Sequence, residues 1–218
     1  LKISIRPHCS VSAIDQGARA VILADGEKIP YSQLVLALGA DQAHLPLTGD
    51  GVTNILTIND LDDYKKFRIA LAGKKRIGII GAGLIGCEFA NDLATAGYHV
   101  DVIDISAQPL GRLLPPAGGA FIQQKLEASG VVFHLNATTQ SVDQMQDHLR
   151  ITFANGASIE TDIVLSAVGL RPRTQLAAAA GIPVNRGIVV NRLLQTQFSN
   201  IYALGDCAEV EGKVLPFV

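Results

Sequence analysis

Three glycines form the most chemically informative pattern in this sequence. Gly81, Gly83 and Gly86 follow an apolar run at 77–80 and open a stretch with helical apolar periodicity. After a strand, the first glycine of such a pattern permits a tight turn, the second lets the backbone approach a pyrophosphate, and the third lets the helix pack closely on the strand. The spacing therefore predicts a dinucleotide-binding loop, and the alternative is a glycine turn without a ligand.

Asp104 completes this pattern. It ends the next apolar strand, 18 positions after Gly86. A carboxylate at that place can accept hydrogen bonds from both ribose hydroxyls, and its charge repels a 2′-phosphate, so NADH is favoured over NADPH. The amides of Leu84 and Ile85 and the helix dipole are expected to face the phosphates.

Two further carboxylates have less specific surroundings. Glu88 lies one turn into the same helix, where it could contact a nicotinamide or a flavin, or could simply be an exposed glutamate favoured by the helix dipole. Asp206 follows Gly205 at the end of a short apolar strand. The glycine would let a cofactor pass and the carboxylate would bind a sugar hydroxyl, although a strand followed by a plain turn fits the same residues.

These residues need a frame of strands and helices to position them. Apolar runs, turn signals and helix caps predict an α/β protein with a parallel sheet, because strands and helices alternate before a β-meander and a last buried strand. We expect strands at 2–5, 19–23, 34–39, 77–80, 100–105, 131–133, 149–153, 157–159 and 163–168, and helices at 58–71, 84–97 and 117–129.

An internal repeat indicates duplicated domains. Residues 25–39 and 155–169 align without gaps at an offset of 130, with identical pairs that include Gly26/Gly156 and Gly39/Gly169. The same offset would put the glycine loop of the first copy roughly 50 residues before Leu1. We therefore predict two three-layer Rossmann-like domains, the first of them incomplete. Residues 1–58 and 170–218 belong to the first domain and residues 59–169 form the second.

Composition excludes several other classes of function. The chain has 218 residues, 48% apolar content and a formal charge of −2, so it lacks the basic character of nucleic-acid binding proteins. No apolar run reaches the length of a membrane span. Three widely separated cysteines exclude a CxxC dithiol and a multi-cysteine zinc site, and this sparse set suits the reducing cytoplasm. The histidines show no metal-ligand spacing, and the basic triplet 74–76 is interpreted as a solvated strand entry.

The order of these motifs resembles the pyridine nucleotide–disulfide oxidoreductases, flavoproteins with two dinucleotide-binding domains. The resemblance rests on segments 36–39, 81–88, 168–172 and 196–206. It implies FAD and NADH as cofactors, with Glu88 between nicotinamide and flavin. It also implies further contacts: Gly169 for NAD, and Val11, Leu38, Gly39, Gly205, Asp206 and Val218 for FAD. Such proteins also have an N-terminal flavin loop and a C-terminal interface domain, which we do not find in this chain.

Segments 58–64 and 110–115 are most similar to rubredoxin–NAD reductases. This resemblance implies hydride transfer from NADH to FAD, followed by single-electron transfer to a small iron–sulfur carrier, with rubredoxin favoured. It leaves open a ferredoxin reductase, an NADH oxidase or a coenzyme A–disulfide reductase on the same frame. An NADH-binding redox sensor with slow turnover is the alternative from another class.

Overall fold

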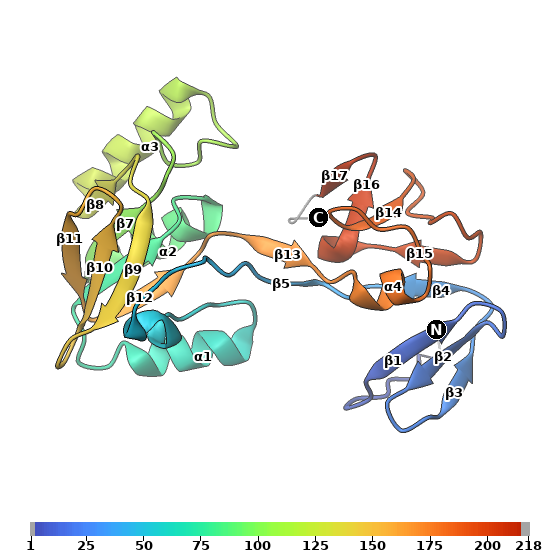
Figure 1. Cartoon of the computed structure of the whole chain (residues 1–218). Helices are drawn as coiled ribbons and strands as arrows, with labels where there is room; N and C mark the ends of the chain where they lie inside the picture. The colour runs from blue at the N-terminus through green and yellow to red at the C-terminus, as the bar shows by residue number, and fades with distance from the viewer. Residues whose placement is uncertain (1–2, 215–218) are drawn as a thin grey trace. The chain divides into compact units, whose positions relative to one another are not determined.

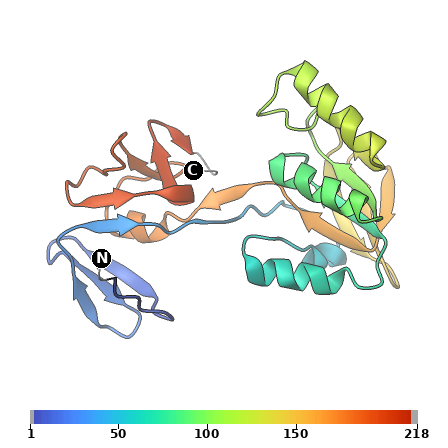
Figure 2. The same cartoon turned by 180° about the vertical axis from the view of Figure 1, so that it is seen from behind.

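The computed structural model describes residues 3–214 and contains two compact units (Figures 1 and 2). One unit combines Leu1–Asp41 with Leu170–Val218, and the other is Gln42–Gly169. Residues 42–58, which the sequence analysis assigned to the first domain, lie in the second compact unit. Their backbone pairs with the second unit instead, since the Leu56 amide donates to the Val164 carbonyl oxygen at 2.8 Å and Thr48 bridges to Ser141.

The second unit is built on a four-stranded parallel sheet in the order β12-β6-β7-β8. Helices lie on one face and a three-stranded antiparallel meander lies on the other (Figure 1), which gives the predicted three layers. The sheet strands are β6 (Arg76–Ile80), β7 (His99–Ile103), β8 (Val131–His134) and β12 (Ile163–Ser166). The helices are α1 (Leu61–Ala70), α2 (Leu84–Thr95) and α3 (Pro116–Ala128), after the short η1 (Asp50–Asn54). The meander consists of β9 (Thr139–Gln144), β10 (Leu149–Phe153) and β11 (Ser158–Thr161).

The alternation of side chains along β6 explains these layers. Ile77 and Ile79 are buried against the helices, whereas Ile80 is buried against the meander. Gly78 lies so close to the meander that a Cβ there would come within 2.8 Å of Ile151 Cδ1. A strand buried on both faces is an apolar run in sequence, as expected for a central parallel strand.

The first unit contains smaller sheets around one core. A meander is formed by β1 (Val11–Asp15), β2 (Ala20–Leu23) and β3 (Lys28–Pro30). Strand β4 (Leu34–Leu36) pairs in parallel with β15 (Ile201–Ala203). The remaining elements are β5 (Ala40–Gln42), β13 (Leu170–Pro172), α4 (Gln175–Ala179), β14 (Ile188–Val190), η2 (Gly205–Cys207), β16 (Ala208–Val210) and β17 (Lys213–Val214). Ile14, Leu36, Ile188 and Ile201 are among the residues that form the shared core.

The two aligned segments of the sequence adopt the same local structure. Gly26 and Gly156 have φ of 89° and 84°, in the hairpins β2–β3 and β10–β11. Gly39 and Gly169 also have positive φ, after β4 and β12. Each hairpin is part of a three-stranded meander, and each following strand pairs in parallel with a strand distant in sequence. The repeat is therefore one of structure as well as of sequence.

Some expectations were wrong. Residues 3–5 form no strand, and Ile3 and Ile5 are exposed. The apolar run at 34–39 predicts a strand buried on both faces, but Val35 is 52% exposed, because alternate residues of β4 point to opposite faces and Leu34 and Leu36 face the core. The helical apolar period places Ile85 on one face with Phe89 and Leu93, but Ile85 is exposed, because the buried face of α2 is formed by Gly86, Cys87, Ala90 and Leu93.

Candidate functional site

The glycine loop connects β6 to α2 at the carboxyl edge of the parallel sheet. Gly81 has φ of +112°, and a Cβ there would lie 2.5 Å from the Ala167 carbonyl oxygen. A Cβ on Gly86 would lie 1.9 Å from the Gly81 carbonyl oxygen. The first glycine therefore makes the turn beside β12, and the third lets the helix start against the loop, as the pattern predicted.

Gly83 is different because a Cβ there would meet no described atom within 4 Å. It is the N-cap residue of α2, and no side chain caps this helix end. The amides of Leu84 and Ile85 are in the first turn, where a helix offers no backbone acceptor. The opening at Gly83 and these amides fit the pyrophosphate of a dinucleotide.

The carboxylate of Asp104 is fixed at the edge of this loop by two backbone amides. Ala82 N donates to one of its oxygens at 2.6 Å, and Ser106 N donates to the other at 2.7 Å. Each oxygen retains a lone pair, so the carboxylate can still accept from ribose hydroxyls. Asp104 thus also ties the glycine loop to the end of β7, which the sequence had not indicated.

The residues after β7 return to the same loop. The Leu110 amide donates to the Ala82 carbonyl oxygen at 2.8 Å, and Leu110 itself is buried with φ of +54°. Gly169 follows β12 at this edge and has φ of +108°, and its carbonyl oxygen accepts a hydrogen bond from the Ala43 amide at 2.9 Å. The structure therefore brings Gly81, Gly83, Gly86, Asp104 and Gly169 to one edge of one sheet.

Cys87 and Glu88 lie on the first turns of α2. Burial raises the pKa of the Cys87 thiol to about 11, with further contributions from the charges of Asp104 and Glu88. A thiol with such a pKa stays protonated at neutral pH and is a poor nucleophile. Its position in the apolar core supports a packing role. Glu88 is exposed, and its carboxylate makes no hydrogen bond or ion pair with another residue in the range 3–214.

In the first unit, a second set of residues meets at the carboxyl ends of β4 and β15. The Leu204 amide donates to the Leu36 carbonyl oxygen at 3.0 Å, which aligns the two strand ends. Cys207 is fully buried between them: its Sγ accepts from the Leu38 amide at 3.4 Å and donates toward the Leu36 carbonyl oxygen at 3.4 Å. The local sequence around Cys207 does not indicate these contacts.

The turns at this edge are open and carry one carboxylate. Gly205 has φ of +71°, and a Cβ there would meet none of the described atoms within 4 Å. Asp206 is half-buried, and no described group donates to its carboxylate. Arg173 contacts the neighbouring turn, donating to the Leu38 carbonyl oxygen at 3.1 Å and pairing with Asp41. An open turn lets a cofactor approach the backbone closely, and a carboxylate without a donor can accept hydrogen bonds from sugar hydroxyls. These two features fit a cofactor that contains a sugar group.

Three other flavin contacts were predicted: Glu88, which lies on α2 of the second unit, Val11 and Val218. Val11 lies on β1, in the separate meander, and is 39% exposed beside an irregularity in the β1–β2 register. Val218 lies outside the described residues. Leu38, Gly39, Gly205 and Asp206 are therefore the predicted flavin residues that the structure brings together. Within residues 3–214, no group of three or more His, Cys, Asp or Glu side chains is arranged to hold a metal ion.

The carboxyl edges of the two units are typical of a protein that binds dinucleotide cofactors, and comparison with known proteins agrees with this class. The family model of the pyridine nucleotide-disulphide oxidoreductases matches residues 2–216, and the chain belongs to this family. The chain is 47% identical to the rubredoxin-NAD(+) reductase of Acinetobacter baylyi, covering 100% of the chain and 57% of that protein. It is 40% identical to the nitric oxide reductase FlRd-NAD(+) reductase of Aeromonas hydrophila, covering 100% and 55%. The chain thus spans just over half the length of these relatives.

Solved structures show the same fold. A ferredoxin reductase from Rhodopseudomonas palustris is 31% identical with a TM-score of 0.88, over 93% of this chain and 50% of that one. Putidaredoxin reductase in its covalent complex with putidaredoxin is 32% identical, with a TM-score of 0.86 over 93% and 50%. An engineered water-forming NADPH oxidase bound to NADPH is 25% identical, with a TM-score of 0.84 over 92% and 46%.

Proposed function

We propose that this protein is an FAD-dependent reductase that takes electrons from NADH and passes them to a small iron–sulfur carrier, with rubredoxin favoured. In this proposal the second unit binds NADH and the first unit contributes to the FAD site. The observation that carries it is the glycine loop, open at Gly83 and bordered by the fixed carboxylate of Asp104. Family membership and the similarity to rubredoxin reductases support the flavin and the carrier.

The residues present fit both cofactors. The Leu84 and Ile85 amides would hold the NADH pyrophosphate, and Asp104 would accept from its adenosine ribose. At the other edge, Asp206 would accept from the ribitol of FAD while Gly39 and Gly205 leave space for it. When bound, these cofactors supply the hydride donor and the acceptor that releases single electrons. The protein contributes binding and orientation.

Asp104 also supports NADH over NADPH. The NADPH-using oxidase differs from its NADH-using parent by substitutions that include a glycine and, eighteen positions later, an aspartate, both replaced by alanine. Gly86 and Asp104 are eighteen positions apart in this chain. A fixed negative charge beside the 2′-position would repel a phosphate there.

The proposed location is the cytoplasm. None of the helices within residues 3–214 has the length and apolar character that a bilayer span requires. The three cysteines of the chain are free thiols, which suits a reducing compartment. A small diffusing carrier would meet the reductase there.

The test uses the full-length protein with its flavin under anaerobic conditions. NADH is added, bleaching of the flavin absorbance is followed, and oxidised rubredoxin is then mixed in, with NADPH run in parallel. We expect bleaching with NADH and reoxidation by rubredoxin over many turnovers per second.

Two outcomes would contradict the proposal. Reoxidation only by oxygen or by a disulfide would indicate an oxidase or a disulfide reductase on the same frame. Fast bleaching with no fast acceptor at all would indicate a redox sensor. Equal rates with NADPH would leave the reductase intact but disprove the role assigned to Asp104.

A further inference from the structure

A hollow of about 450 Å³ lies at the other end of the parallel sheet from the glycine loop. It is formed where α1 leads into β6 and where α2 leads into β7. β6 and β7 run in parallel from this end to the cofactor edge, a distance of about 16 Å for a five-residue strand. The polar side chains around the hollow are Arg68, Lys74, Lys75, Tyr98 and His99.

The cations of this hollow have no acidic partners. Neither Lys74 nor Lys75 forms an ion pair with any residue in the range 3–214. Within the described residues, the Arg68 guanidinium donates to the Tyr64 hydroxyl at 3.3 Å and lies over the face of the same ring, and it forms no ion pair. In a chain with a net charge of −2, three unpaired cations around one hollow are a local concentration of positive charge.

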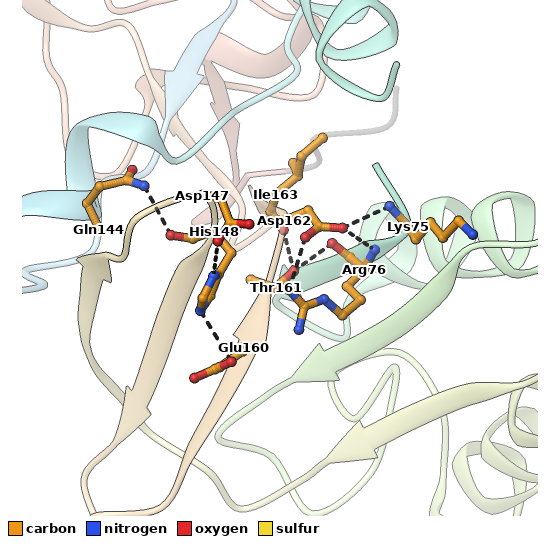
Figure 3. A network of polar contacts seen from close by, with 9 residues as sticks. All are labelled: Lys75, Arg76, Gln144, Asp147, His148, Glu160, Thr161, Asp162 and Ile163. Carbon is orange, nitrogen blue, oxygen red and sulfur yellow. Dashed lines mark hydrogen bonds and ion pairs between the residues drawn. The ribbon is translucent and has the colours of Figure 1, made fainter. Parts of the chain in front are cut away.

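The nearest carboxylate is already engaged. Asp162 accepts from the Lys75 and Arg76 amides, both at 2.9 Å, and pairs with the Arg76 guanidinium at 3.1 Å. Figure 3 shows the Lys75 side chain extending away from this carboxylate. Asp162 therefore neutralises Arg76 and fixes the start of β6, while the ammonium group of Lys75 remains available.

The solvated strand entry inferred from the basic triplet does not account for this arrangement. Arg68 comes from α1, whereas Lys74 and Lys75 belong to the segment that enters β6, so two segments bring cations to one hollow. A guanidinium fork beside two ammonium groups is the donor set that proteins use for phosphate oxygens. The hollow is also within the size range of small-ligand sites.

We propose that this hollow binds a small polyphosphate anion, such as the di- or triphosphate group of a phosphorylated metabolite, independently of the dinucleotide loop. The sheet separates the two places, so occupation of one leaves the other open. The ligand would be held by Arg68, Lys74 and Lys75, with Tyr98 beside it.

The experiment is a calorimetric titration of inorganic tripolyphosphate into the full-length flavoprotein, without NAD⁺ and with saturating NAD⁺. The nucleotide occupies the glycine loop in the second titration, so any remaining binding occurs elsewhere. The test variant is Lys74→Gln/Lys75→Gln. The matched control is Lys28→Gln/Lys125→Gln, which removes the same charge from exposed lysines on β3 and α3.

We expect one tripolyphosphate per chain in saturating NAD⁺, at least tenfold weaker binding in the test variant, and less than a twofold change in the control. Circular dichroism melting curves check that each variant is folded. Equal weakening in both variants would show non-specific attraction and overturn the proposal, as would loss of all binding in NAD⁺. Binding of polyglutamate but not of tripolyphosphate would assign the surface to an acidic protein instead.

Discussion

The carboxyl edges of the two units differ in how firmly they hold their functional groups. In the second unit, β6 is flanked by β12 and β7, and backbone amides fix both oxygens of Asp104. In the first unit, β4 and β15 form a two-stranded pair, and no described group donates to Asp206. The side chains of Val35 and Leu204 there are 52% and 42% exposed. Backbone amides therefore hold the carboxylate at the glycine-loop edge in place, whereas no donor among residues 3–214 holds the carboxylate at the other edge.

Substitution of Gly81 should give the largest effect, because it acts on the organised edge. Gly81→Ala would place a Cβ 2.5 Å from the Ala167 carbonyl oxygen at a φ that only glycine adopts easily. We expect NADH to bind at least a hundredfold more weakly and the free energy of unfolding to fall by about 2–4 kcal/mol. Stopped-flow flavin reduction and thermal melting measure the two effects.

Gly205→Ala is the matching change at the open edge. The φ is again positive, but a Cβ would meet no described atom, so we expect a loss of only about 1 kcal/mol. Gly130→Ala, with φ of +95° and open space, controls for the backbone effect alone. NADH binding within threefold of wild type in Gly81→Ala would mean that the nucleotide edge is not rigid.

Asp104→Ala should give the next largest effect. The substitution removes the ribose acceptor and both amide hydrogen bonds, so we expect the KM for NADH to rise about tenfold or more. The preference for NADH over NADPH should fall by at least tenfold, because the repulsive charge is gone.

Asp101→Asn is the control for Asp104→Ala. Asp101 lies on β7, the strand that leads to Asp104, but its carboxylate contacts the His134 ring at 2.7 Å instead of the glycine loop. Steady-state kinetics with both nucleotides separate the two variants. An unchanged preference for NADH over NADPH in Asp104→Ala would mean that residues other than Asp104 determine the nucleotide specificity.

The difference between the edges also explains what the sequence could predict. The glycine loop, Asp104 and the strands around them could all be predicted, because a complete βαβ unit is continuous in sequence. Each glycine of the loop is also required by a single steric constraint, either a tight turn or a close approach of the backbone. The hairpin turns at Gly26 and Gly156 are also local, because a glycine in a tight turn can adopt the positive φ that the turn requires. The sequence therefore indicated most of the second unit.

The remaining features depend on contacts between distant segments. Cys207 bridges to Leu36 and Leu38, about 170 residues away, and nothing in the local pattern indicates this. Residues 42–58 belong to the second unit because their backbone pairs with β9 and β12, which lie about 90 to 110 residues further along the chain.

Asp162→Asn should have a moderate effect on stability at the amino end of β6. Burial alone would raise the pKa of Asp162, but the amides of Arg76 and Lys75 and the guanidinium hold it below its usual range. A lowered folded-state pKa stabilises the protein above the unfolded-state value of about 3.9, and this stabilisation is lost as the pH falls through the folded-state value. We expect a loss of about 1–2 kcal/mol at pH 7.

The pH dependence provides the control for Asp162. The stability curves of wild type and Asp162→Asn should begin to converge as the pH falls below about 4 and should meet below the lowered folded-state pKa of Asp162, where the wild-type carboxyl group is protonated. Asp147 also has a lowered pKa, through its hydrogen bond to His148, but its side chain is 89% exposed (Figure 3). Asp147→Asn should leave the melting temperature unchanged. Parallel curves at all pH values would show that Asp162 acts by packing and not by charge.

Thiol modification should have the smallest effect, although each edge contains a buried cysteine. Cys87 and Cys207 are 6% and 0% exposed, and a pKa of about 11 leaves only about one thiolate in a thousand at Cys87 at pH 8. Cys9 is exposed. A maleimide should therefore label Cys9 alone, as mass spectrometry of peptides would show, with the rate of flavin reduction unchanged within twofold. If Cys207 is labelled and Cys87 is not, the edge at β4 and β15 opens in solution, and the contrast between the two edges becomes one of dynamics as well as of structure.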